Sequence, residues 1–552
     1  MRASGILMPI FSLPSKYGIG TFSKEAREFV DQLFEARQKF WQVLPLGPTS
    51  FGDSPYQSFS SFAGNPYFID MDELYNEGLL MKDELPKQQE KYTNGPTYIN
   101  YELLYKTRYH ILRKAYQRFD KNTTSFHQFQ LENDYWLKGY SSFMAIKNYY
   151  KDQDMYHWDI KIRKRETDAL NHMLQVCEEE IGFYEFLQFK FMEQWDKLHQ
   201  YANSKGIQII GDIPIYVAFD SADCWNSPEL FQLDKDLKPI AVAGCPPDFF
   251  AKTGQLWGNP LYQWEYHKET NYEWWVNRIR HSLKLYDSVR IDHFRGFDEY
   301  YSIPYGDKTA EHGTWIKGPG IDLFHCLNKQ IGKKVEFENQ FNFSELKTQS
   351  NFSEMNNKFD CDKSESNAAG QELSIIAEDL GFLTDSVIQL LNESGYPGMK
   401  ILQFAFDSRE DSNYIPHTYS KNCVVYTGTH DNDTIIGWLE SIHKEDCEYA
   451  LTYLGIDKNK PEVHWDFIRL GMASVADTAI FPIQDYLGLG SKARINIPST
   501  LGNNWRWRLL PNELTPDIIS KIGQMTKLYG RANKLIPSVV CETKEQDYSK
   551  QA

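Results

Sequence analysis

Residues 288–297 read Ser288-Val289-Arg290-Ile291-Asp292-His293-Phe294-Arg295-Gly296-Phe297, so charged side chains interrupt what is otherwise the pattern of a buried strand. The two-residue period of a strand puts Arg290 and Asp292 on the same face. A nearby guanidinium favours the ionised form of a carboxyl, and an ionised carboxylate in dry surroundings can act as a nucleophile. We therefore expect this face to carry the chemistry, while an Arg–Asp pair on a solvated sheet edge is the alternative.

Further short apolar runs alternate with helical patterns along the chain, and several of them end in polar residues. The runs cover residues 5–10, 40–46, 205–217, 288–294, 374–377, 399–404, 422–426 and 478–482. This alternation is typical of a parallel (β/α) barrel, in which chemistry lies at the carboxyl ends of the strands. A doubly wound sheet is the alternative, but neither G-x-G-x-x-G nor G-x-x-x-x-G-K-[ST] opens any of the helical patterns.

Two segments depart from the alternation. Between residues 75 and 200, apolar residues recur at helical spacing between charges with few Gly or Pro, which predicts a helical insertion subdomain. Between residues 333 and 372 the chain is rich in Asn, Ser, Glu and Lys, which predicts an exposed, mobile loop insertion. Residues 1–552 are expected to form a single catalytic domain that contains both of these segments.

The composition restricts the partners and the compartment. A formal net charge of -16 without an extended Lys/Arg stripe argues against nucleic acid and anionic membranes, and a neutral substrate fits the 15% of aromatic residues better. The 8 cysteines are scattered without a C-x-x-C pair, which argues against a disulfide framework or a zinc cluster. With no signal peptide and no window of 18 apolar residues, we expect a cytoplasmic protein.

Three acids follow apolar runs and are therefore expected to meet at one end of the barrel: Asp292, Glu378 and Asp431, accompanied by Arg290 and His430. Convergent carboxylates without a His/Cys cluster fit glycosidic-bond chemistry, in which one carboxylate attacks the anomeric carbon and another protonates the leaving oxygen.

The two roles require two environments. Asp292 beside Arg290 is expected to stay ionised, whereas burial and the charge of Asp292 should keep Glu378 protonated at neutral pH. The two carboxyl groups are expected to lie about 5 Å apart. A magnesium or calcium site is the alternative for clustered acids, but Arg290 and Arg295 weigh against it.

Residues 47–67, with small residues, prolines and interspersed rings, have the composition of a shaped, ligand-facing loop, and a packed structural loop is the alternative. Residues 243–260 resemble a lid, and both stretches are expected to be irregular loops. In them Tyr56 and Trp257 could stack on a sugar ring or could be core anchors. We expect residues 244–258 to be a lid that covers the site and excludes water.

A set of motifs resembles, in order from about residue 4 to about residue 530, those of the 4-alpha-glucanotransferases, also called amylomaltases or disproportionating enzymes, glycoside hydrolase family 77. The motifs are Ser54-Pro55-Tyr56-Gln57-Ser58, Gly211-Asp212-Ile213-Pro214, Pro246-Pro247-Asp248-Phe249-Phe250, Gly254-Gln255-Leu256-Trp257-Gly258-Asn259-Pro260, Arg290-Ile291-Asp292-His293-Phe294-Arg295-Gly296, Ala377-Glu378-Asp379-Leu380-Gly381, Thr429-His430-Asp431-Asn432 and Arg494-Ile495-Asn496. The segment 333–372 is longer than the family usually has before Glu378.

The resemblance implies an α/β fold, a (β/α)8 TIM barrel with helical and loop insertions, and retaining transfer of α-1,4-glucan segments to a glucose or glucan acceptor. It implies maltodextrins or starch-derived glucans as substrates, and neither a metal nor a cofactor. By resemblance Asp292 is the nucleophile, Glu378 the acid/base, and Asp431 the residue that grips sugar hydroxyls and distorts the ring. The implied donor-subsite contacts are Ser54, Tyr56, Asp212, Gln255, Trp257, Arg290, His430 and Asn496.

Two other functions stay open at this point. An α-amylase-type hydrolase would use the same acids. A catalytically silent glucan-binding protein would keep the aromatic residues, but the presence of all three acids counts against it.

Overall fold

The computed structural model describes residues 2–50, 52–86, 97–247, 252–332, 373–381, 383–457 and 460–533. The predicted loop insertion 333–372 lies outside these ranges.

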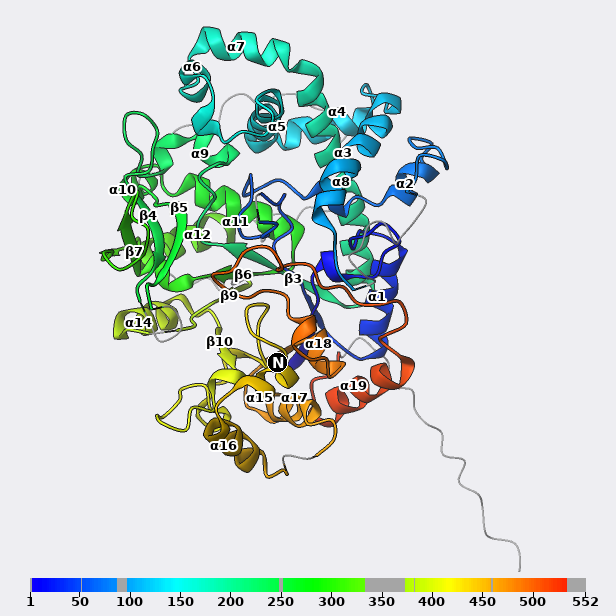
Figure 1. The fold of residues 1–552 in the computed structure, drawn as a ribbon, viewed down its shortest axis with the longest axis vertical. Helices are drawn as coiled ribbons and strands as arrows, with labels where there is room; N and C mark the ends of the chain where they lie inside the picture. The colour runs from blue at the N-terminus through cyan, green and yellow to red at the C-terminus, as the bar shows by residue number, and fades with distance from the viewer. Residues whose placement is uncertain are drawn as a thin grey trace, which may run out of the picture.

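Eight parallel strands form the central sheet, in the order β10-β11-β12-β1-β2-β3-β6-β9 (Figure 1). The strands are β1 (Ala3–Leu7), β2 (Phe40–Gln42), β3 (Gln208–Pro214), β6 (Ser288–Asp292), β9 (Ile375–Ala377), β10 (Gly398–Ile401), β11 (Cys423–Tyr426) and β12 (Thr478–Pro482). The sheet curls until its two end strands, β9 and β10, meet. The predicted (β/α)8 barrel is therefore confirmed.

The strands are apolar on both faces because each face meets a different apolar layer. Neighbouring residues such as Ile209 and Ile210 belong to separate buried clusters, one that includes the helices and a smaller one built from strand residues. The smaller cluster contains Leu7, Ile210, Ile376, Met399, Ile401, Val424, Tyr426 and Ile480. The strand period places these residues inside the barrel. Arg290 is the register partner of Ile376 on β9 and of Asp212 on β3. Because register partners point to the same face of a sheet and Ile376 belongs to the interior cluster, Arg290 also faces the barrel interior.

Helices surround the barrel and extend beyond it at both ends of the molecule (Figure 1). Their bounds are α1 (Lys24–Glu35), α2 (Met71–Asn76), α3 (Tyr101–Arg118), α4 (Thr124–Glu132), α5 (Asp134–Tyr149), α6 (Ile160–Arg163), α7 (Thr167–Val176), α8 (Glu178–Ser204), α9 (Ala222–Asn226), α10 (Trp264–Glu269), α11 (Glu273–Leu285), α12 (Ile321–Leu327), α14 (Asp385–Ser394), α15 (Ile435–Ser441), α16 (Lys444–Leu454), α17 (His464–Ala473), α18 (Ile483–Tyr486) and α19 (Pro516–Leu528). Within the described residues, none of the helices is long and apolar enough to cross a membrane.

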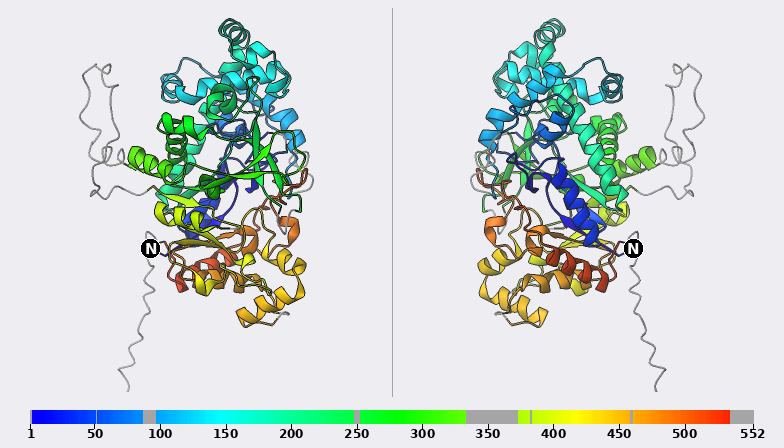
Figure 2. Two further views of the ribbon diagram at one scale, coloured as in Figure 1. Left: turned by 90° about the vertical axis from the view of Figure 1, so that its left-hand side faces the viewer. Right: turned by 90° about the vertical axis from the view of Figure 1, so that its right-hand side faces the viewer.

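The segment between β2 and β3 is mostly helical, from α2 to α8. The side views show α3 to α7, coloured cyan, at the opposite end of the molecule from the yellow to red helices α15 to α19 (Figure 2). The last helix of the segment, α8, packs on α1 and on β3 and so returns the chain to the barrel. That residues 75–200 form an inserted subdomain stays a prediction.

A second, antiparallel sheet has the strand order β5-β4-β7-β8. Its strands are β4 (Ala241–Cys245), β5 (Gln255–Pro260), β7 (Glu299–Pro304) and β8 (Thr314–Lys317). β7 contacts the short helix Phe294–Phe297 that follows β6, so the sheet is attached beside Asp292. The interpretation of 243–260 as irregular loop is partly wrong, because strands β4 and β5 occupy its two ends; residues 248–251 lie outside the described ranges.

The barrel closes between β9 and β10 without a strand ladder in the described residues. The Ala377 amide donates to the Pro397 carbonyl at 3.0 Å, and the Met399 amide donates to the Asp379 carboxylate at 2.6 Å. The buried Asp379 side chain thus replaces backbone pairing at this seam. It requires glycine at Gly398, since a Cβ there would lie 2.6 Å from Asp379 Oδ2.

We expect Gly398→Ala to lower the free energy of unfolding by about 1–3 kcal/mol, because the added methyl group overlaps the Asp379 carboxylate and pushes β9 and β10 apart. Urea titration followed by tryptophan fluorescence measures the change. Gly490→Ala is the matched control, since a Cβ at Gly490 meets no atom within 4 Å. Equal stability of the two variants would contradict a tight seam.

Candidate active site

The Arg290 guanidinium is the centre of the site. It donates from Nη1 to both oxygens of Asp212 at 2.8 Å, and from Nη2 to Asp292 Oδ1 at 2.8 Å. Its Nε contacts Met399 Sδ at 3.3 Å. Arg290 is 3% exposed, so the pair with Asp292 lies inside the barrel and not on a solvated sheet edge. One buried cation thus orients carboxylates from β3 and β6.

Glu378 lies directly beside Asp292 in the strand order. The preceding residues, Ile291 and Ala377, are register partners. Glu378 Oε2 accepts the His293 amide at 2.7 Å, and Oε1 accepts the Leu380 amide at 2.8 Å. These two bonds fix the direction of the carboxyl group. His293 adopts a left-handed conformation, with φ 54, which is uncommon for a residue other than glycine.

The environment of Glu378 keeps its proton on at neutral pH. Burial and the negative charge of Asp292 raise the pKa of Glu378 to about 8, against the opposing effects of Arg290 and the two backbone donors. A carboxylic acid that is protonated at pH 7 beside an ion-paired carboxylate is the division of roles that a retaining glycosidic mechanism needs.

Asp431 lies in the loop after β11 and is held from two sides. Its Oδ1 accepts the Asn496 amide group at 2.7 Å, and its Oδ2 lies 3.4 Å from His430 Nε2. Burial acts to raise the pKa of Asp431, but His430, Asn496 and Arg290 outweigh it and lower the pKa to about 2. Asp431 is therefore ionised across the physiological range and can accept hydrogen bonds from sugar hydroxyls.

Tyr56 links the two halves of the site. Its hydroxyl donates to Asp212 Oδ2 at 2.8 Å and lies 3.4 Å from His430 Nδ1. Its ring stacks on the His430 imidazole with centroids 4.9 Å apart. Tyr56 is half-buried, so its ring is not a fully enclosed core anchor. Ser54 contacts its chain neighbours: the Tyr56 backbone amide donates to Ser54 Oγ at 3.3 Å, and the Gln57 backbone amide donates to the Ser54 carbonyl at 3.2 Å.

Gln255 and Trp257 approach the site from the second sheet. Both lie on β5, where Trp257 Nε1 donates to Gln255 Oε1 at 3.1 Å. The half-buried Trp257 ring meets the His293 ring edge to face at 4.8 Å. Because His293 directly follows Asp292, this aromatic ring flanks the proposed nucleophile.

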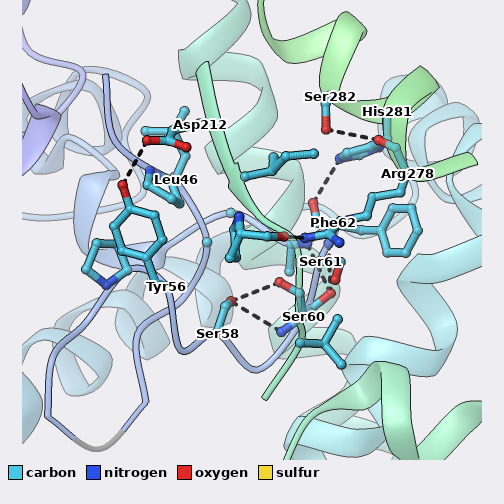
Figure 3. Close-up of a pocket in the computed structure, with 18 of the residues that line it drawn as sticks. Leu46, Tyr56, Ser58, Ser60, Ser61, Phe62, Asp212, Arg278, His281 and Ser282 are labelled. Atoms are coloured by element: carbon cyan, nitrogen blue, oxygen red, sulfur yellow. Dashed lines mark hydrogen bonds between the residues drawn. The ribbon is translucent and has the colours of Figure 1, made fainter. Parts of the chain in front are cut away.

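A small cavity opens beside Tyr56 and Asp212, and Figure 3 shows the bond between these two side chains at its edge. Its volume is about 50 Å³, enough for a few water molecules. Its lining contains Tyr56 and Asp212 but not Asp292, Glu378 or Asp431; Ser58, Ser60, Ser61, Arg278, His281 and Ser282 supply polar groups. The cavity therefore lies next to the site and is too small to hold a glucan chain.

Among the residues described by the structure, no group of three or more His, Cys, Asp or Glu side chains is arranged to hold a metal ion. Instead, Asp212 and Asp292 share the Arg290 guanidinium, which occupies the position a cation would take.

Three contact residues were not assigned from the sequence. Met399 contacts the Arg290 guanidinium through its sulfur atom. Trp505 packs at 5.8 Å from both the Tyr56 and the His430 ring. Arg494 donates to the Asp431 carbonyl at 2.6 Å, and its place two residues before Asn496 was the one available signal.

Comparison with known proteins agrees with this geometry. The family model for glycoside hydrolase family 77, described as 4-alpha-glucanotransferase, matches residues 8–514. A 4-alpha-glucanotransferase from Clostridium butyricum is 46% identical over 95% of this chain and 100% of its own length. One from Streptococcus pneumoniae is 42% identical over 97% and 98%.

A solved structure of the same kind matches the whole fold. The amylomaltase from Streptococcus agalactiae in complex with acarbose superposes with a TM-score of 0.87 at 40% identity, over 96% of this chain and 100% of that one. The family model and these relatives cover nearly the whole chain, and the chain therefore belongs to glycoside hydrolase family 77, the family of the 4-alpha-glucanotransferases.

Proposed function

We propose that this 4-alpha-glucanotransferase moves α-1,4-glucan segments by double displacement on Asp292, with Glu378 as the acid/base. The observation that carries the proposal is the pair of neighbouring carboxyl groups at the ends of β6 and β9. One is held by Arg290 at 2.8 Å, and the other has a pKa of about 8 because of burial and the charge of Asp292.

In the first step a carboxylate oxygen of Asp292 bonds to the anomeric carbon, the bond from that carbon to the glycosidic oxygen breaks, and Glu378 gives its proton to the departing O4. In the second step the 4-hydroxyl of an acceptor glucose or glucan attacks the same carbon, the ester to Asp292 breaks, and the hydroxyl proton passes to Glu378. Two inversions at one carbon leave the α configuration unchanged.

The surrounding residues bind the donor sugar. Ionised Asp431 accepts hydrogen bonds from hydroxyls of the reacting ring and favours its distortion, and Asn496 and His430 hold it in place. Tyr56 and Trp257 offer half-buried rings for the apolar faces of glucose units. Ser54, Asp212, Gln255 and Arg290 complete the donor subsite.

Maltodextrins and starch-derived glucans are the proposed donors, in keeping with a relative's structure in complex with acarbose. The 8 scattered cysteines without a C-x-x-C pair support a reducing compartment, and we place the enzyme in the cytoplasm. We further propose a single catalytic domain over residues 1–552, with residues 75–200 as a helical insertion in it.

Incubation with maltotriose, followed by separation of the products by size, tests the function. We expect glucose together with a ladder of longer maltodextrins and an almost constant number of reducing ends, because each bond broken is replaced by a bond formed. An α-amylase-type hydrolase would instead raise the number of reducing ends without lengthening any chain, and that result would overturn the proposal.

A further inference from the structure

Asp485 is a buried carboxyl group that the mechanism does not use. It lies on the short helix α18, immediately after β12, and is 1% exposed. Its Oδ2 accepts the Thr427 hydroxyl at 2.5 Å, and its Oδ1 accepts the Ile435 amide at 2.8 Å.

The two partners of Asp485 bracket the loop that carries His430 and Asp431. Thr427 is the first residue after β11, and Ile435 is the first residue of α15. A single carboxyl group therefore ties the beginning of the loop to its end. A loop whose two ends are fixed at one point has fewer conformations available, so the side chains that it carries are placed more precisely.

The same loop is held on its other side by the segment after α18. Arg494 donates to the Asp431 carbonyl at 2.6 Å, and the Asn496 backbone N–H donates to the His430 carbonyl at 3.1 Å. Residues 485–496 therefore hydrogen-bond both to the ends of the loop, through Asp485, and to its middle, through Arg494 and Asn496. Removal of the Asp485 side chain would take one hydrogen bond from each end of the loop, while Asp431 would stay attached to Asn496 and Gln403 would keep its bonds to the Thr427 and Asp433 carbonyls.

Burying Asp485 is costly. Burial and the charge of Asp433 raise the pKa of Asp485 to about 6, although the Thr427 hydroxyl and the Ile435 amide favour the ionised form. A buried polar group stabilises a fold less than an apolar one of the same size. We therefore expect Asp485 to contribute by fixing the position of the loop between Thr427 and Ile435, and not by stabilising the fold.

We propose that Asp485 is a positioning residue that sets the place of His430 and Asp431 relative to the reacting sugar ring. The proposal rests on the function proposed above for Asp431. Asp485 itself does not touch the substrate.

Acarbose affinity, measured by isothermal titration calorimetry, tests the proposal. We expect Asp485→Ala to weaken acarbose binding by about 10-fold or more, since two hydrogen bonds to the loop are lost. Asp485→Asn should stay within about 3-fold of the unmodified enzyme, because its amide oxygen can accept from Ile435 and its amide nitrogen can donate to the Thr427 oxygen. Thr427→Val removes one tether alone and should give an intermediate loss, which keeps the test open if Asp485→Ala does not fold.

A double-mutant cycle separates positioning from general destabilisation. If Asp485 acts through Asp431, adding Asp485→Ala to Asp431→Ala should weaken binding by less than about 3-fold further. The control is Asp70→Ala, since Asp70 is likewise a buried acid, 4% exposed, whose pKa burial raises to about 6, but it caps α2. This control should lower the Tm and leave acarbose affinity unchanged.

Each outcome has one meaning. Unchanged affinity in Asp485→Ala and Thr427→Val, or losses that multiply in the double variant, would overturn the positioning role and leave the proposed function intact. Unchanged affinity in Asp431→Ala would instead overturn the role given to Asp431.

Discussion

Replacement of Asp292 by alanine should lower the rate of maltotriose disproportionation by at least about 10⁴-fold, because the proposed covalent intermediate forms on this carboxylate. The fold should survive the change, since Arg290 keeps both bonds to Asp212. Circular dichroism and the Tm check the fold, and product separation by size measures the rate.

Sodium azide provides a sharper control for this variant. Azide that enters the space left by the carboxylate can attack the anomeric carbon of α-maltosyl fluoride, displace fluoride and yield the β-configured azide. We expect this product from Asp292→Ala and not from the unmodified enzyme. Activity within ten-fold of the unmodified enzyme would show that Asp292 is not the nucleophile.

Replacement of Glu378 by glutamine should lower kcat for maltodextrin donors by about 10²–10⁴-fold, because a glutamine cannot protonate the departing O4. The loss should be much smaller for the first step with α-maltosyl fluoride, whose leaving group needs no proton. Burst kinetics of fluoride release measure that step separately.

The pH profile identifies Glu378 independently. Burial and the charge of Asp292 raise its pKa to about 8, and the first step requires the protonated form. In the unmodified enzyme kcat/KM should therefore be at its full value below this pKa and fall as the pH rises through it. The falling limb should be absent from Glu378→Gln and unchanged in Glu393→Gln, an exposed acid on α14. A limb that persists in Glu378→Gln would belong to another group.

The features that follow from local pattern could be predicted from the sequence. Strand and helix alternation gave the barrel, and the strand period gave the shared face of Arg290 and Asp292. Since the carboxyl ends of parallel strands meet at one end of a barrel, the placement of Glu378 and Asp431 near Asp292 also followed. Family resemblance supplied the donor-subsite roles of Tyr56, Asp212 and Asn496. In the structure Tyr56 and Arg290 both bond to Asp212, and Asn496 bonds to Asp431.

The remaining contacts join residues that are far apart in the chain and carry no local signal. Met399 contacts Arg290 across 109 positions, and Asp485 reaches Thr427 across 58. Trp257 was assigned to an irregular loop, but it lies on β5, because the antiparallel partner strand β4 is separated from it by Gly- and Pro-rich residues that conceal the pairing. Sequence periodicity describes which face of an element is apolar, but not which distant element meets that face.

Glu378 directly follows Ala377. In the part of the chain that the structure describes, the Pro397 carbonyl and the Asp379 side chain join β9 and β10 there, in place of a ladder. Strands joined by few hydrogen bonds separate at a lower cost in free energy than strands paired along a ladder. Separation of these strands would admit water to the Glu378 carboxyl and would lower its pKa toward that of a solvated glutamate. The separation of β9 from β10 and the pKa of Glu378 would therefore be thermodynamically linked.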